Sequence, residues 1–184
     1  TSNFDETSRV YVTFGVEGGE LLENGKDVPW GVTNLTASIL GEGTKNKTPE
    51  QLENALEKLG ANIGFSSSNT GFTVFLECEK SKLDESLKLM EEMVFEPRWD
   101  EEEFKKIRKR SVEGVKSNLS SRSAGLSNAW SRLKYGESSF GHYTSPEELS
   151  KVNLEDCKKY YESYFNSNNS RLVVVGPITS TEVT

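Results

Sequence analysis

Histidine is almost missing from this chain of 184 residues, which contains only His142, together with two cysteines and two methionines. Peptidase zinc sites commonly hold the metal with two histidines and one acidic residue. A two-histidine zinc site therefore cannot exist within this chain. Cys78 and Cys157 could pair or remain free thiols, and two cysteines do not reveal the redox compartment.

Long apolar runs and an excess of positive charge are missing as well. No run approaches the roughly 18 apolar residues of a membrane-spanning helix, so the sequence predicts no membrane span. Acidic residues outnumber basic ones by 29 to 22, and the net charge of −7 repels a phosphate backbone, which argues against a nucleic-acid partner. With 34% apolar residues the chain resembles a folded globular protein, and its length suits a single domain over residues 1–184.

Several segments alternate apolar and polar residues, the pattern of a strand with one buried face. Arg9–Val16, Ala61–Phe65 and Phe72–Cys78 follow this pattern, and the polar segment Ser66–Gly71 joins the last two as a hairpin. Leu172–Val175 is continuously apolar instead, which predicts a central strand that is buried on both faces.

Other segments carry apolar residues at helical spacing, and several begin with a capping residue. The first three expected helices are Val32–Leu40 ended by Gly41, a helix capped by Thr48 and stopped by Gly60, and one capped by Ser81 and ended before Pro97. A long helix follows, with Asp100 and Glu103 as a capping box and a break at Ser120–Ser123. The last three are a helix with Leu126, Trp130 and Leu133, a short one from Ser145-Pro146, and one capped by Asn153 with Asp156. Because hairpins and helix pairs mix without strict βαβ alternation, the fold class is α+β, with a mostly antiparallel sheet packed by helices on one side.

Three blocks in a fixed order resemble a known family. The first block is Gly31–Leu40 with Gly43-Thr44 and Leu59-Gly60-Ala61, the second is Phe95–Phe104, and the third runs from Tyr160-Tyr161 to Leu172–Gly176. Together they resemble the first domain of the pitrilysin/insulinase-type (inverzincin) zinc peptidases, from Val10 to Gly176. The resemblance implies the metallohydrolase-like fold of that family.

Active members of this family carry H-x-x-E-H on the first helix, where two histidines bind zinc and the glutamate activates water. Aligned on Gly43-Thr44, those positions hold Asn34, Ala37 and Ser38 here, and the third ligand, a glutamate on the long helix, corresponds to Gly114. The resemblance therefore implies a degenerate domain. We expect no catalytic, cofactor-binding or metal-binding residue in this chain, and zinc only in a partner domain.

The resemblance also implies a function, because family members clamp a peptide between two homologous halves. The chain would be a non-catalytic domain that helps to enclose and position peptide substrate for a partner half carrying H-x-x-E-H. The alternative is a purely structural scaffold or assembly subunit with no role in proteolysis. We further expect a domain excised from a longer chain, in which the arginine and tyrosine that grip the substrate would lie beyond Thr184. The excised fragment is expected to self-associate. The resemblance to long bacterial relatives also implies a periplasmic location.

Other residues invite functional readings but have simpler structural ones. His142 could serve a serine or cysteine nucleophile, but no nucleophile-elbow motif is present, so a loop histidine without a catalytic role is the simpler interpretation. Glu101–Glu103 could form a carboxylate cluster for acid/base work or metal binding, but they suit the first turn of a helix, where the dipole favours negative charge. The basic run Lys105–Arg110 suits a solvated face, with docking as the alternative. The aromatic segment Tyr160–Phe165 could stack on bases but suits a core, and Cys78 lies on an apolar strand face as an inert buried thiol.

Overall fold

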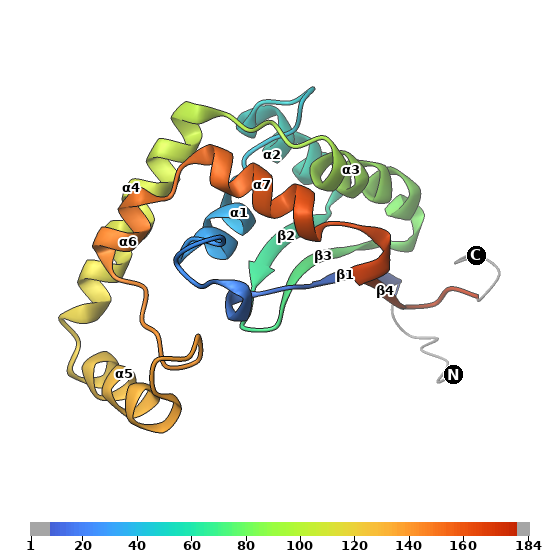
Figure 1. Ribbon diagram of the computed structural model, residues 1–184. Coiled ribbons are helices and arrows are strands. Elements are labelled where there is room, and N and C mark those ends of the chain that lie inside the picture. The colour runs from blue at the N-terminus through green and yellow to red at the C-terminus, as the bar shows by residue number, and fades with distance from the viewer. Residues whose placement is uncertain (1–7, 180–184) are drawn as a thin grey trace.

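The computed structural model describes residues 8–179, which form one antiparallel sheet with helices gathered on one side (Figure 1). The sheet has four strands in the order β2-β3-β1-β4. The strands are β1 (Arg9–Glu17), β2 (Asn62–Ser67), β3 (Gly71–Glu79) and β4 (Ser170–Val175). The predicted α+β class with a mostly antiparallel sheet and the predicted hairpin are confirmed.

The alternation in β1 and β3 sets which face of the sheet is covered. Val12 of β1 lies opposite Leu76 of β3, and both side chains are 1% exposed on the helix side. The neighbouring residues point to the other face, where Tyr11 is 45% exposed and Phe75 is 37% exposed. Since strand side chains alternate between the two faces, one face forms the core and the other remains open within the described chain.

The prediction of a central strand at Leu172–Val175 is wrong, because β4 lies at the edge of the sheet. It pairs antiparallel with β1, with Phe14 opposite Leu172 and Val12 opposite Val174. Leu172 is 54% exposed and Val175 is 49% exposed. A continuous apolar run predicts a strand that is buried on both faces, yet no further strand or helix of the described residues covers the outer edge of β4.

Seven α-helices and three 3₁₀ turns complete the described chain (Figure 1). They are η1 (Glu20–Leu22), α1 (Val32–Leu40), α2 (Pro49–Leu59), η2 (Lys80–Lys82), α3 (Leu83–Phe95), α4 (Glu101–Leu119), α5 (Arg122–Tyr135), α6 (Pro146–Lys151), α7 (Leu154–Tyr164) and η3 (Ser167–Asn169). Within residues 8–179, no helix combines the length and the apolar character that crossing a membrane requires.

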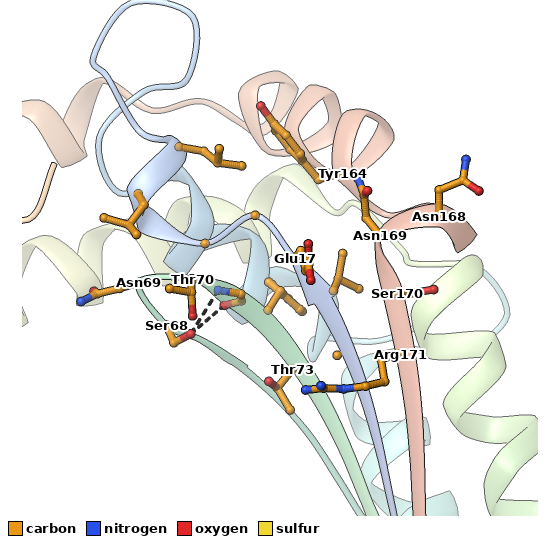
Figure 2. Close-up of a pocket in the computed structure, with 18 residues that line it drawn as sticks. Glu17, Ser68, Asn69, Thr70, Thr73, Tyr164, Asn168, Asn169, Ser170 and Arg171 are labelled. Atoms are coloured by element: carbon orange, nitrogen blue, oxygen red, sulfur yellow. Dashed lines mark hydrogen bonds between the residues drawn. The ribbon is translucent and has the colours of Figure 1, made fainter.

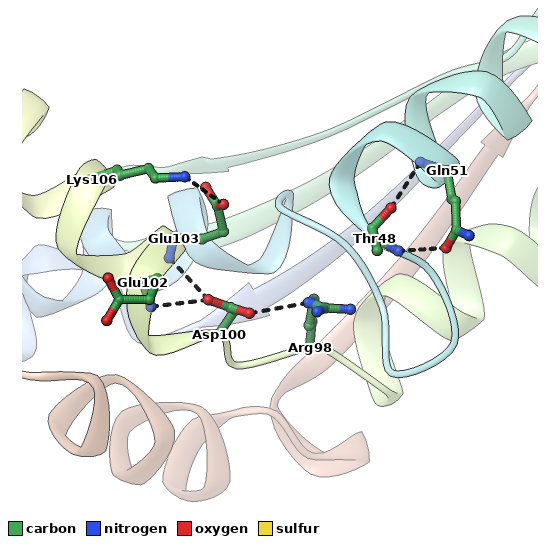
Figure 3. Close-up of polar contacts among 7 residues, drawn as sticks. All are labelled: Thr48, Gln51, Arg98, Asp100, Glu102, Glu103 and Lys106. Carbon is green, nitrogen blue, oxygen red and sulfur yellow. Dashed lines mark hydrogen bonds and ion pairs between the residues drawn. The ribbon is translucent and has the colours of Figure 1, made fainter.

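The capping motifs show why most helices begin where the sequence predicts. Thr48 forms a complete capping box with Gln51 at the start of α2, and Figure 3 shows both of its hydrogen bonds. Asp100 accepts the backbone N–H groups of Glu102 and Glu103. The box predicted there is incomplete, because the Glu103 side chain pairs with Lys106 instead of returning to Asp100 (Figure 3).

Three further helix starts can be compared with prediction. The helix predicted to start at Ser145-Pro146 and the cap predicted at Asn153 with Asp156 are both present, and α6 and α7 each begin with a complete capping box. The cap predicted at Ser81 is wrong, because Ser81 lies inside η2 and α3 begins at Leu83 with no side-chain cap. The 3₁₀ turn therefore leads directly into α3 and replaces the cap.

Helix α1 lies between two apolar clusters. Ala37 and Leu40 belong to the sheet cluster, which joins α1, α2 and α3 to the helix side of the sheet. Val32, Leu35 and Ile39 belong to the helix cluster, which joins α1 to α4, α6 and α7. All five side chains are at most 6% exposed, so α1 is held on most of its circumference and fixes the layers relative to one another.

We expect Asp100→Ala to lower the free energy of unfolding by about 1 kcal/mol, because α4 loses its N-cap acceptor. Asp100→Asn keeps the acceptor oxygen and should lose less stability.

The backbone N–H of Glu103 and the side chain of Arg98 hold the pKa of Asp100 below its usual value, against a smaller opposing effect of burial. The charge-dependent stability is therefore present above the unfolded pKa and is lost as the pH falls through the lower folded pKa. Urea unfolding at a series of pH values should show the free energies of unfolding of wild type and Asp100→Asn converging as the pH falls through the folded pKa of Asp100.

Candidate functional site

The N-terminus of α1 is built around the buried carboxylate of Glu23, which is 2% exposed. The two oxygens of Glu23 accept the backbone N–H groups of Gly31, at 2.8 Å, and Thr33, at 3.0 Å. These groups belong to the donors that a helix start leaves without partners. Glu23 therefore caps α1 from eight residues away in the chain, measured to Gly31.

Burial and the cap act in opposite directions on Glu23. Burial raises the pKa of the carboxyl group, and the N–H groups of Gly31 and Thr33 offset part of this rise. Gly31 has φ 87°, a left-handed conformation, and a Cβ there would lie 2.4 Å from Cδ1 of Leu149. Glycine is therefore required at the point where the chain enters α1. The sequence predicts the helix at Val32–Leu40 without this cap, because Gly31 at the N-cap has no side-chain acceptor and Glu23 lies eight residues away in the chain.

The outer face of α1 carries Asn34 and Ser38, the two positions predicted to correspond to zinc-binding histidines. Asn34 is exposed and Ser38 is half-buried one turn later, and the Ser38 hydroxyl donates to the Asn34 carbonyl oxygen at 3.0 Å. Glu42 continues the same line beyond the end of α1 and lies 3.6 Å from Arg110 of α4. Helix α4 thus runs past the face that holds Asn34 and Ser38.

Gly114 lies in the second half of α4, seven residues beyond the buried Ile107. Seven residues are close to two helical turns, so the two positions share one side of the helix. A Cβ built on Gly114 meets no heavy atom within 4 Å. The position is therefore open to a larger side chain. That Gly114 stands for the family's third ligand stays a prediction.

These residues do not fit a zinc ion. Asn34 offers an amide, Ala37 a methyl group that faces the sheet cluster at 6% exposure, Ser38 a hydroxyl already used by the backbone, and Gly114 no side chain. Zinc in peptidases takes imidazole nitrogen and carboxylate oxygen. Across residues 8–179, no group of three or more histidine, cysteine or acidic side chains could hold a metal ion.

Comparisons with known proteins identify the family. The family model for insulinase, peptidase family M16, matches residues 1–140. This chain belongs to the insulinase family. The inactive domain of a peptidase M16 from Pseudomonas fluorescens is similar in structure, with a TM-score of 0.89 and 19% identity over 97% of this chain. A protease from Helicobacter pylori is also similar, with a TM-score of 0.84 and 22% identity over 96% of this chain.

The two similar structures are longer than this member of the insulinase family. The chain covers 43% of each of them. At these identities the similarity shows a common fold, while membership of the family rests on the model matched over residues 1–140. No curated protein sequence matches the chain significantly.

His142 has a structural role in this insulinase-family chain. Its ring stacks on Trp30 with centroids 3.7 Å apart, and its Nε2 lies 3.2 Å from Oε2 of Glu148. Glu148 is also the N3 residue of the capping box that begins α6. His142 therefore joins the loop after α5 to the loop before α1, and within residues 8–179 the hydrogen-bonding partner of its ring is Glu148 rather than a serine hydroxyl or a cysteine thiol.

Neither cysteine is suited to act as a nucleophile. Cys78 and Cys157 are free thiols, and both are fully buried. Burial raises the pKa of Cys157 to about 12, with a smaller opposing effect from Thr36. Burial also raises the pKa of Cys78. Because the thiolate is the reactive form, both groups remain protonated and inert near neutral pH.

The charged run along α4 is engaged mainly in local pairs. Glu102 and Glu103 pair with Lys105 and Lys106 three residues later. Arg108 donates to the carbonyl oxygen of Val152 at 2.7 Å, which ties α4 to the segment between α6 and α7. These contacts agree with the structural reading of the acidic and basic residues, and they leave no carboxylate cluster arranged for acid/base work.

The tyrosines of α7 are packed rather than displayed. Tyr160 is 4% exposed, and its hydroxyl donates to the carbonyl oxygen of Gly18 at 2.9 Å. Tyr161 donates to the carbonyl oxygen of Val94 at 2.6 Å. Burial raises the pKa of Tyr160 to about 12. The interpretation of this segment as core, rather than as a stacking surface for bases, fits these contacts.

A cavity of about 780 Å³ lies at one end of the sheet (Figure 2), and its lining includes none of Asn34, Ala37, Ser38 and Gly114. Glu17 and Arg171 are its only charged lining residues, and Arg171 points across the strands toward Thr73 (Figure 2). The rest of the lining is backbone, apolar or neutral polar. The cavity offers hydrogen-bonding groups without a nucleophile beside a base, so it has no catalytic arrangement.

We expect the triple variant Asn34→His, Ser38→His and Gly114→Glu to bind zinc more tightly than the double variant with the two histidines alone. Asn34 and Ser38 lie one turn apart, and a glutamate at position 114 would add a third ligand. Binding should still be weak, since missing groups around the ligands typically cost 10–100-fold. Calorimetric titration of zinc into both variants measures the difference.

The wild-type chain is the control for this experiment. Stripped of metal and re-exposed to zinc, it should retain no stoichiometric zinc in elemental analysis. If the triple variant binds zinc no better than the double variant, the alignment of Gly114 with the third ligand is wrong. Ala37→Glu is left out of the design because it would place a carboxylate against the apolar sheet cluster.

We expect Gly114→Ala to raise the free energy of unfolding by about 1 kcal/mol, because glycine inside a helix is that much less favourable than alanine. Gly60→Ala is the matched control, since a Cβ at either position meets nothing within 4 Å. Gly60 has φ 61°, so alanine there is strained and should destabilise the protein. Urea unfolding of both variants gives the two signs, and a destabilising Gly114→Ala would contradict the open environment of α4.

Proposed function

We propose that this chain is a non-catalytic domain of an insulinase-family assembly, which helps to enclose and position peptide substrate for a partner half. One observation carries the proposal. The family fold is present with a tightly packed α1, while the four positions predicted for the zinc chemistry hold Asn34, Ala37, Ser38 and Gly114. Packing residues and ligand positions occupy different parts of α1, so the helix keeps its structural role without the metal.

The partner we propose is a homologous domain or subunit that carries H-x-x-E-H and holds the zinc. The chain covers 43% of each similar structure, which supports a larger assembly around this fold. The same resemblance supports a bacterial source and a periplasmic location. Peptide substrate would be bound in the assembled chamber rather than by this chain alone.

Helix α5 supplies a surface that suits such assembly. Leu126, Trp130 and Leu133 recur at i, i+4 and i+7, and they are 74%, 64% and 79% exposed. We call these three residues the α5 stripe. Helix α5 buries no residue of its own and lies apart from the sheet in Figure 1. An exposed apolar stripe of this kind marks an interaction site, and we assign it to the partner half.

A second candidate is a scaffold of the same fold that assembles without any part in proteolysis. The α5 stripe favours it equally, because the stripe shows a contact surface and says nothing of peptide turnover. The two candidates differ in one measurable respect. An enclosing domain changes the rate at which the partner half cleaves peptides, and a scaffold does not.

The test is to combine the chain with a family member from the same organism that carries H-x-x-E-H, and to follow cleavage of a fluorogenic peptide. The chain alone should show no cleavage, and its addition should raise kcat/KM of the partner at least several-fold. Trp130→Lys should weaken both the complex and the gain, while Lys109→Ala on exposed α4 serves as the surface control. A complex that forms without any change in cleavage would support the scaffold and overturn the enclosing role.

A further inference from the structure

The outer edge of β4 is unusually apolar for an edge strand. Leu172, Val173 and Val175 are 54%, 43% and 49% exposed, and within residues 8–179 the only strand beside β4 is β1. Edge strands are normally protected by lysine, proline, a bulge or a covering segment, because their free N–H and C=O groups can pair with another strand. Leu172–Val175 contains neither lysine nor proline and pairs with β1 in unbroken register.

Both faces beside this edge are also apolar. On the helix side, a groove of about 320 Å³ lies between Leu172 and α3 and is lined by Leu87, Met90, Val94 and the 61% exposed Phe95, with Phe14 and one charged residue, Glu91, completing the lining. On the open face, Tyr11 lies opposite Val175 and is 45% exposed. A strand added to β4 would therefore meet apolar surface with both sets of its side chains.

We propose that β4 pairs antiparallel with β4 of a second copy of this chain, about a two-fold axis that passes through Val173. The two sheets would join edge to edge into one continuous sheet. The helices of both copies would lie on the same side, since a two-fold axis normal to the sheet keeps the two faces apart. The contact is isologous, so one surface serves both copies.

The register follows from the alternation of side chains. Opposite residues in an antiparallel pair point to the same face, so Val173 lies opposite its own counterpart, Leu172 opposite Val174 of the second copy, and Arg171 opposite Val175. This register uses all four apolar residues of Leu172–Val175. It also places the two Arg171 side chains four residues apart along the strands, roughly 13 Å, which is beyond the Debye length of about 8 Å at physiological salt.

The composition of β4 favours a second copy as the occupant. Arg171 is the only charged residue in Ser170–Val175, so two such strands meet without an unpaired carboxylate at the contact. The net charge of −7 per chain opposes association at long range, and salt screens this repulsion. The dissociation constant of the dimer should therefore fall as the salt concentration rises from about 0.02 M to about 0.15 M. Above that range the repulsion is screened, and the apolar contacts determine the affinity.

Sedimentation equilibrium tests the proposal with the whole chain. Wild type should form dimers that dissociate on dilution, and Val173→Lys should raise the dissociation constant at least tenfold. Ser66→Lys on the opposite edge strand β2 and Trp130→Lys in the α5 stripe are matched controls that should leave dimerisation unchanged. Thermal unfolding confirms that each variant is folded. A monomeric wild type, or dimers lost in Trp130→Lys and kept in Val173→Lys, would overturn the proposal.

Cysteine cross-linking tests the register and does not depend on tolerance of a lysine. Opposite residues of an antiparallel pair have Cα atoms about 4.5–5.5 Å apart, within the range of a disulfide. Val173→Cys should therefore form a covalent dimer on mild oxidation. Val175→Cys should not, because the two copies of residue 175 would lie roughly 13 Å apart. The native Cys78 and Cys157 are buried and should not compete. Efficient cross-linking through position 175 but not 173 would overturn the proposed axis.

This inference is separate from the proposed role beside a catalytic half. Failure of the β4 pairing would leave the cleavage experiment and the α5 stripe untouched. Conversely, a dimer through β4 would stand even if the chain left peptide turnover unchanged. The two experiments use different surfaces, Val173 in one case and Trp130 in the other, so their outcomes can be assigned.

Discussion

The position of α1 between two apolar clusters is the constraint on which the rest of this structure depends. The helix contributes Ala37 and Leu40 to the sheet cluster and Val32, Leu35 and Ile39 to the helix cluster. A helix buried so completely must also satisfy the polar groups at its start. Glu23 does so from outside the helix, and its burial is tolerated because two backbone N–H groups share its charge.

The same arrangement separates the packing of α1 from the positions that we predict to correspond to zinc ligands. The residues that hold α1 in place and those that would bind a metal lie on different sides of the helix. Asn34 is exposed and Ser38 is half-buried, and neither belongs to an apolar cluster. The residues at these two positions can therefore change at little cost to packing. Ala37 is the exception, because it faces the sheet cluster and its methyl group fits there.

The exposed apolar surfaces carry most of the remaining functional information. The α5 stripe and the edge of β4 are both apolar, yet they differ in what they can bind. A helix stripe offers side chains alone, whereas a strand edge also offers backbone hydrogen bonds and thereby sets direction and register. The two contacts that we propose, a partner half at α5 and a second copy at β4, therefore use distinct surfaces.

The sequence by itself determined the local elements and the missing chemistry. Thr48, Ser145 and Asn153 begin their helices as predicted because a cap depends on residues three apart in the chain. A single histidine excludes a two-histidine site in any fold. Three features instead depend on how the chain packs in three dimensions: the place of Leu172–Val175 at an edge, the exposure of Trp130, and the cap from Glu23 to α1. Each of these depends on which distant segments become neighbours, and an apolar run or a lone glutamate reads the same whether or not such a neighbour is present.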